Sequence, residues 1–123
     1  MSVVPVEIRL RKKSRLIAVT FEDGNSFDLP FEYLRVYSPS ADVKGHGPGQ
    51  EVLQTGKENV RVTLVEPVGH YAVRLVFDDG HDTGLYTWKY LYELGEARAE
   101  NWQTYLDRLE AAGYARHDRV DTE

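Results

Sequence analysis

The sequence predicts an α+β domain with a mainly antiparallel sheet. Three observations support this prediction: a length of 123 residues, a strand–turn–strand–helix unit that occurs twice, and a C-terminal stretch with apolar residues at helical spacing. A chain of this length usually forms one domain and is long enough to bury a core without cross-links. We therefore expect a single domain over residues 1–115, followed by a polar tail at 116–123.

The repeated unit begins with an alternating apolar run that ends in Phe, an acidic residue, Asp and Gly. The two copies of this run lie at 17–24 and 73–80. Asp-Gly is typical of a tight turn, because glycine accepts a positive φ and aspartate bonds to its own backbone. Each copy continues through a second short run into an aromatic–charged–Tyr–Leu string, at 31–34 and 88–91. Two copies are too few for a solenoid, so we expect one sheet with pseudo-symmetric halves.

In the first half, polar and apolar residues alternate over 5–11 and 16–22, which predicts a hairpin. A third strand is expected at 26–29, and Pro30 suits the first turn of a short helix. Residues 38–58 contain two prolines and four glycines. This stretch is therefore predicted to be mostly irregular.

In the second half, alternation predicts one strand at 60–65 and another at 71–77. Thr87 can cap the helix that follows, and Gly95 is expected to interrupt that helix. Aromatic and leucine residues then recur at helical spacing up to a closing Gly113, which predicts a C-terminal helix. Those residues are Trp102, Tyr105, Leu106 and Leu109.

Composition excludes several classes of protein. The chain has no cysteine, which excludes disulfides, iron–sulfur ligation and a cysteine nucleophile. No apolar run approaches the roughly 20 residues of a membrane span, and the N-terminus lacks a signal-peptide pattern, so we expect a cytoplasmic protein without a membrane partner. Residues 1–16 carry five basic side chains, but the net charge is −5. Alternation there predicts a solvated strand face and argues against nucleic-acid binding.

Residues 78–82 place three carboxylates and an imidazole next to one another. Oxygen and nitrogen donors at this density can bind a divalent cation. The chemistry of a tight turn explains Asp79 and Gly80, however, which leaves His81 as the residue of interest. No Gly-x-Ser-x-Gly elbow or His-x-Asp motif is present, so we predict no catalytic residue.

Two other groups of residues have both a structural and a functional interpretation. Tyr86, Trp88 and Tyr90 can form an aromatic pocket for a small molecule, or they can belong to the core. The glycine-rich stretch 38–50 lacks the Lys-Ser/Thr pair of a phosphate-binding loop, so we interpret it as a loop that contacts a partner. Its candidate contact residues are Lys44, His46, Gly47 and Gly49.

Several strings in the sequence resemble the gamma-butyrobetaine hydroxylase-like N-terminal domain family, long catalogued as a domain of unknown function. They lie at 77–88, 33–36, 38–41 and 45–50, and the resemblance covers about residues 5–96. It implies a small standalone bacterial member of the family. Other members form the N-terminal domain of carnitine-pathway dioxygenases or are attached to P-loop ATPases that carry iron–sulfur clusters.

In those dioxygenases the domain binds a structural zinc through three thiolates and a histidine. The resemblance places the thiolate positions on Ser38, Ser40 and Val43, and the histidine on His81. Zinc prefers Cys and His in a closed tetrahedron, and Val43 has no donor atom. We therefore expect neither a metal nor another cofactor, and a domain that folds on its core alone.

The catalytic iron of the dioxygenases lies in a further C-terminal domain, so the resemblance implies that this domain is not an enzyme. We expect a non-catalytic accessory or interaction domain with a protein partner, linked to iron–sulfur or dioxygenase systems. The alternative is a small-molecule binder or an enzyme that uses an aromatic pocket near His81.

Overall fold

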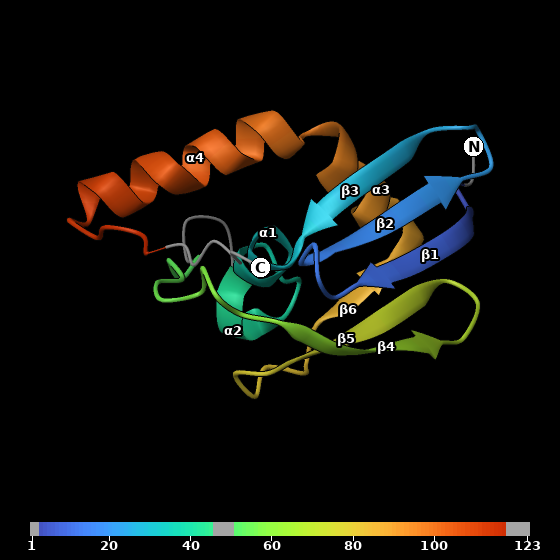
Figure 1. The fold of residues 1–123 in the computed structure, drawn as a ribbon, viewed down its shortest axis with the longest axis horizontal. Coiled ribbons are helices and arrows are strands. Elements are labelled where there is room, and N and C mark those ends of the chain that lie inside the picture. Colours follow the sequence, from blue (N-terminus) through green and yellow to red (C-terminus); the bar gives the residue numbers. More distant parts are fainter. Residues whose placement is uncertain (1–2, 46–50, 118–123) are drawn as a thin grey trace.

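The computed structural model describes residues 3–45 and 51–117, whose strands form two antiparallel sheets of three strands each (Figure 1). The first sheet has the order β1 (Pro5–Arg11), β2 (Leu16–Phe21), β3 (Ser26–Pro30). The second has the order β4 (Val62–Val68), β5 (Ala72–Phe77), β6 (Leu85–Thr87). The predicted α+β class is confirmed. The two copies of the repeat form two sheets, however, rather than the two halves of one.

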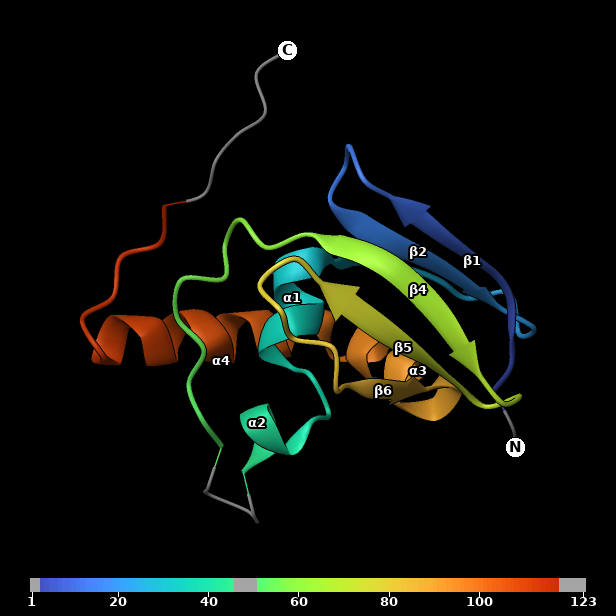
Figure 2. The same cartoon turned by 90° about the horizontal axis from the view of Figure 1, so that it is seen from below.

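Four helices complete the fold. They are α1 (Phe31–Val36), α2 (Ala41–Lys44), α3 (Trp88–Glu96) and α4 (Arg98–Ala111). α3 contacts both β3 and β6 and lies behind the sheets in Figure 1, while α4 extends away from them (Figures 1 and 2). Among the helices of the described residues, none combines the length and the apolar character that crossing a membrane requires.

The two predicted turns have the same geometry. Gly24 and Gly80 both adopt a φ of 90°, a left-handed value that favours glycine. Asp23 Oδ1 accepts a hydrogen bond from the amide two residues later at 2.9 Å, and Asp79 Oδ1 does the same for the His81 amide at 3.1 Å. The internal repeat is therefore a repeat of structure, and it sets His81 at a defined place beside the second turn.

The core lies between the sheets and the helices, and both halves contribute to it. Each of the two sheets turns one face inward, so alternate residues of β2 and β5 are buried. The largest buried side chains are aromatic and come from both copies of the repeat: Phe21, Phe31, Tyr33, Phe77 and Tyr86. A smaller cluster packs α4 against the end of α1 through Val36, Tyr105 and Leu109.

The stretch predicted to be mostly irregular contains one four-residue helix, α2, which Ser40 caps by accepting a hydrogen bond from the Asp42 amide at 3.3 Å. Two other local predictions were wrong in their boundaries. β4 continues through Pro67, which is paired in register with Val73, because β4 is an edge strand, where proline is tolerated. Gly95 does not interrupt α3, which continues to Glu96.

Gly95 is explained by packing instead. A Cβ atom at this position would lie 2.3 Å from Cγ of Phe27 on β3, closer than any real contact allows. The Phe27 ring is itself held edge-on by Phe21 and Tyr92, with ring centroids 6.0 and 5.4 Å away. Gly95 therefore lets α3 approach the first sheet closely.

We predict that Gly95→Ala destabilises the fold. Helix propensity alone would favour alanine by roughly 1 kcal/mol. Overpacking against Phe27 should outweigh this and lower the free energy of unfolding by about 1–3 kcal/mol, as measured by urea denaturation. In a Phe27→Ala background the same substitution should cost much less. A Gly95→Ala variant that is more stable than the wild type would contradict this account.

Candidate functional site

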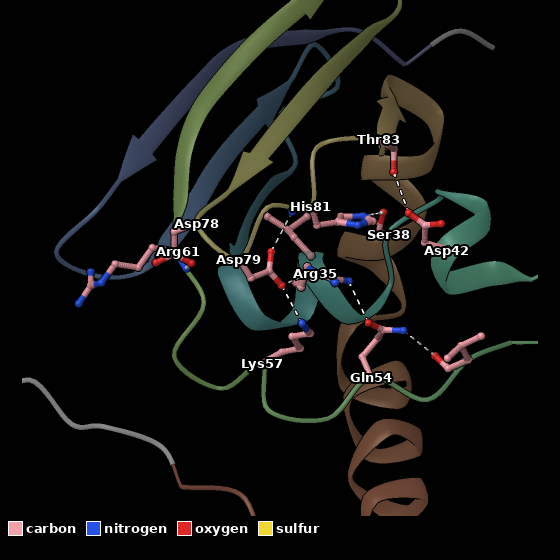
Figure 3. A network of polar contacts seen from close by, with 12 residues as sticks. Arg35, Ser38, Asp42, Gln54, Lys57, Arg61, Asp78, Asp79, His81 and Thr83 are labelled. Atoms are coloured by element: carbon pink, nitrogen blue, oxygen red, sulfur yellow. Dashed lines mark hydrogen bonds and ion pairs between the residues drawn. The ribbon is translucent and has the colours of Figure 1, made fainter.

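The turn after β5 and the segment after α1 meet in a buried polar network (Figure 3). Its central contact is a hydrogen bond of 2.8 Å between Ser38 Oγ and His81 Nε2. Ser38 is fully buried and His81 is 8% exposed. The structure thus brings together two residues, 43 positions apart, that the family resemblance had assigned to one site.

Local sequence positions both partners. α1 ends at Val36, and the Ser38 amide then donates to the Arg35 carbonyl at 3.3 Å, which directs the chain past the second turn. Gly84 permits the close approach, because a Cβ there would lie 2.6 Å from Ser38 Oγ. A side chain at position 84 would therefore push Ser38 away from His81.

The network continues to the start of α2. The Ser40 amide donates to Ser38 Oγ at 3.2 Å, and Ser40 Oγ lies 2.7 Å from Thr83 Oγ1. Thr83 in turn donates to Asp42 Oδ2 at 3.4 Å (Figure 3). Hydroxyl groups therefore bridge the two chain segments at several successive points.

An ion-pair cluster lies on the other side of His81. Asp79 Oδ2 accepts from Arg35 Nε at 2.9 Å and from Lys57 Nζ at 2.7 Å. Arg35 is buried and also donates to Gln54 Oε1 at 3.0 Å. Burial by itself would raise the pKa of Asp79, but the bonds from Lys57, the His81 amide and Arg35 lower it to about 2.

The same surroundings act on His81. Burial lowers the pKa of its imidazole, and the nearby Arg35 cation lowers it further. The neutral form of the ring is therefore favoured, and in the contact with Ser38 either Nε2–H donates to the hydroxyl oxygen or the hydroxyl donates to Nε2, depending on the tautomer. In this state the pair forms a structural hydrogen bond between two buried groups.

The donor set does not fit the zinc of the related dioxygenase domains. His81 Nε2 is already bonded to Ser38, Ser38 and Ser40 offer only neutral hydroxyls, and Val43 is a buried apolar side chain. Within the described residues, no group of three His, Cys, Asp or Glu side chains is placed to bind a metal. Hydrogen bonds join the segments that zinc would otherwise cross-link.

Of the three residues of the predicted aromatic pocket, Tyr86 and Tyr90 are neighbours, with ring centroids 6.2 Å apart, and each of the three donates to a different backbone carbonyl. Tyr86 is fully buried and donates to the Leu34 carbonyl at 2.6 Å. Tyr90 is partly buried and donates to the Tyr37 carbonyl at 2.6 Å. Trp88 is also partly buried, and its indole donates to the His70 carbonyl at 2.7 Å. Only Trp88 of the three lines one of the surface grooves described below.

Of the predicted partner-contacting residues, the structure describes only Lys44. It is exposed at the end of α2, with its ammonium group 4.5 Å from the centre of the Tyr90 ring. His46, Gly47 and Gly49 lie outside the described residues. Docking through this loop stays a prediction.

Sequence reasoning missed an apolar surface that centres on Trp88. One groove, of about 470 Å³, runs between the edge strands β1 and β4 and includes Val6, Val65 and Trp88. A second groove, of about 580 Å³, lies on the other side of Trp88 and includes Val3 and Tyr71. We call these two grooves the Trp88 surface. The alternation of β1 could have indicated it, because Val6 shares a predicted apolar face with Ile8 and Leu10, which line the same groove.

Comparison with known proteins identifies the family. The model of the family described as "Gamma-butyrobetaine hydroxylase-like, N-terminal" matches residues 8–92, more than half of the chain. The chain therefore belongs to this family, and the resemblance seen in its sequence is confirmed. No curated protein matches the chain.

Solved structures agree with this assignment. Two proteins known from solution NMR structures are 49% and 47% identical to this chain, each with a TM-score of 0.82; they cover 98% of this chain and 90% and 95% of their own. A protein of unknown function from Acidithiobacillus ferrooxidans, of the DUF971 family, has a crystal structure with 46% identity and a TM-score of 0.63. That match covers 74% of this chain and 91% of the other.

We predict that the purified protein carries no stoichiometric zinc or iron. Three of the four positions that bind zinc in the related dioxygenase domains are Ser38, Ser40 and Val43 here, and the fourth ligand is held by a hydrogen bond. Elemental analysis after dialysis against a mild chelator should find far less than one metal ion per chain. About one ion per chain that survives this treatment would contradict the prediction.

We further predict that Asp79 contributes stability that acid removes. Its folded-state pKa of about 2 is below the ordinary value of 3.8, so folding favours the ionised form. The contribution is complete above the ordinary pKa and is lost as the pH falls towards about 2. Asp79→Asn should lower the free energy of unfolding at pH 7 by about 1–3 kcal/mol, because Arg35 loses a charged partner.

Urea denaturation of the wild type and Asp79→Asn across pH 2–7 checks this prediction. The difference between the two proteins should shrink as the pH falls below the ordinary pKa of the carboxyl. Asp28→Asn, at an exposed position of β3, is the control and should change stability by less than about 0.5 kcal/mol. A difference that stays constant down to pH 2 would show that ionisation of Asp79 is not the cause.

Proposed function

We propose that this chain is a non-catalytic interaction domain that binds a protein partner at the Trp88 surface. The observation that carries the proposal is the exposure of large apolar side chains around the two grooves. Val6 is 64% exposed and Tyr71 is 57% exposed. Adjoining apolar side chains that face solvent are typical of a surface that another molecule covers.

The shape of the surface favours a polypeptide over a small molecule. Its first groove is bordered by β1 and β4, each at the edge of its sheet. An edge strand offers backbone N–H and C=O groups that its own sheet does not use, and an extended segment of a partner can pair with them. Apolar side chains of that segment would then lie against Val6, Val65 and Trp88.

The chemistry of the candidate site supports a non-catalytic role. The Ser38–His81 pair lies in the interior, and the ionisable groups beside it are bonded to one another rather than directed at an open cavity. Tyr86 donates its hydroxyl to a backbone carbonyl. These polar groups hold the fold together. From the family's occurrence, we propose that the partner belongs to an iron–sulfur or dioxygenase system.

We predict that Val6→Glu weakens partner binding while Val52→Glu does not. Both positions are exposed valines, at 64% and 51%. Val6 lines the Trp88 surface, whereas the Val52 amide donates to the carbonyl of Val43 in the stretch 38–50. The partner is first identified with a photo-crosslinking amino acid at position 6 in the native cell and then purified. Calorimetry should show about tenfold or more weaker binding for Val6→Glu.

The matched pair of variants also separates the proposal from its alternatives. If Val6→Glu binds the partner as tightly as the wild type and Val52→Glu or Lys44→Ala binds it more weakly, the partner contacts the loop at 38–50 instead of the Trp88 surface. A betaine or a 2-oxo acid that raises the melting temperature in proportion to its occupancy would favour the small-molecule alternative instead. Unchanged melting temperatures of both valine variants would show that they remain folded.

A further inference from the structure

The segment that follows α4 folds back onto buried carboxylates. Gly113 adopts a φ of 75° just after the helix and turns the chain. Tyr114 then donates its hydroxyl to Glu58 at 2.8 Å, and the His117 amide donates to the same carboxylate at 2.7 Å. Side-chain contacts therefore hold residues 114–117, which form neither helix nor strand.

Arg116 makes the principal contact of this segment. Its Nε donates to Glu32 Oε2 at 2.8 Å, and its Nη2 donates to Glu32 Oε1, so guanidinium and carboxylate bind at two points. The Cζ atom of Arg116 lies 5.3 Å from the centre of the Trp102 ring. A carboxylate beside an aromatic face is an arrangement that suits a guanidinium group.

The carboxylate belongs to the rigid part of the molecule. Glu32 lies on α1, and its side chain is 8% exposed, against 22% for Arg116. Tyr105 on α4 donates to Glu32 Oε2 at 2.7 Å and orients it. Burial and the neighbouring Glu32 raise the pKa of Tyr105, so its hydroxyl stays protonated as a donor. The acceptor is thus fixed by two helices, whereas its cation comes from an irregular segment.

There is room beside the guanidinium group. A cavity of about 300 Å³ is lined by Glu32, Glu58, Trp102 and Arg116, together with Arg15 and Arg98. Withdrawal of residues 114–117 would enlarge this cavity and leave Glu32 without its charged partner. A buried carboxylate without a cation is costly, so the vacated position would favour another cation of the same shape.

We propose that Glu32, Trp102 and Tyr105 form a binding site for a guanidinium group, which Arg116 occupies as a tethered ligand. When Arg116 is absent, the site accepts the same group from outside the chain, either an arginine side chain of another protein or a free guanidinium compound. Two parallel donors match the two oxygens of Glu32, which a lysine ammonium cannot reproduce. This site lies on α1 and α4, and it does not depend on the proposed role of the Trp88 surface.

The test uses the full chain with Arg116→Ala and three probes: N-acetyl-arginine amide, N-acetyl-lysine amide and free L-arginine. Binding is followed by NMR through the indole resonance of Trp102, which a Trp102→Phe spectrum assigns. We expect saturable binding of N-acetyl-arginine amide to Arg116→Ala, at least about tenfold tighter than that of the lysine probe, which corresponds to one charge-assisted hydrogen bond. Wild-type protein should not respond, because its site is filled.

Two further variants complete the design. Arg116→Ala combined with Glu32→Gln should lose the binding, since the neutral amide cannot form the ion pair. If Arg116→Ala does not fold, Arg116→Gln replaces it, and a rise in melting temperature with the arginine probe is the readout. If free L-arginine binds more tightly than N-acetyl-arginine amide, the result favours a free guanidinium compound as the external ligand. If the two probes bind equally, the result favours an arginine side chain of another protein. Equal affinity for arginine and lysine probes, or an unchanged indole resonance at all concentrations, would overturn the proposal.

Discussion

The burial of α1 on all sides is the constraint on which the rest of this structure depends. All six residues of this short helix are buried, including a glutamate and an arginine. A helix buried all round is normally apolar, because each ionised side chain in the interior needs a partner. Glu32 is bonded to Arg116 and Tyr105, and Arg35 to Asp79 and Gln54. Each partner comes from a different part of the chain, so α1 determines where those parts lie.

Two buried tyrosine hydroxyls also connect α1 to the second half of the chain. Tyr86 donates to the Leu34 carbonyl, and the Tyr33 hydroxyl donates to the Leu94 carbonyl at 2.6 Å, so each half of the repeat is bonded to the other through a tyrosine. Tyr90, the equivalent of Tyr33 in the second aromatic string, likewise donates to the Tyr37 carbonyl at 2.6 Å. These bonds explain why tyrosine rather than phenylalanine stands at both equivalent places. A phenylalanine would pack equally well but would leave a buried carbonyl without its donor.

The parts of the fold that the sequence predicted are those in which the signal is local. The Asp-Gly turns, the alternation of β1, β2 and β5 and the Thr87 cap depend on neighbouring residues, and the structure contains all of them. Gly95 was misinterpreted because its reason lies in Phe27, far away along the chain. The division into two sheets likewise depends on tertiary packing, which periodicity does not report.

The candidate site shows the same division. The resemblance to the family brought Ser38 and His81 together before the structure did, but the pairing of Arg35 with Asp79 had no sequence signal. Asp79 had been fully explained by its turn, and only the fold shows that its second oxygen neutralises a buried arginine. A turn residue with one oxygen bonded to the backbone still has another available for a distant partner.

The residues at the zinc-binding positions of the related dioxygenase domains and the charged residues of α1 can be understood together. A structural metal fixes chain segments to one another and contributes folding free energy directly. Here the segments at 38–45 and 78–84 are joined by hydroxyl contacts and by the Arg35–Asp79 pair, each of which contributes far less than a metal would. The core adds to these contacts, and both sheets contribute side chains to it that are almost fully buried. The Trp88 surface and the proposed Glu32 site are both presented by the chain folded in this way.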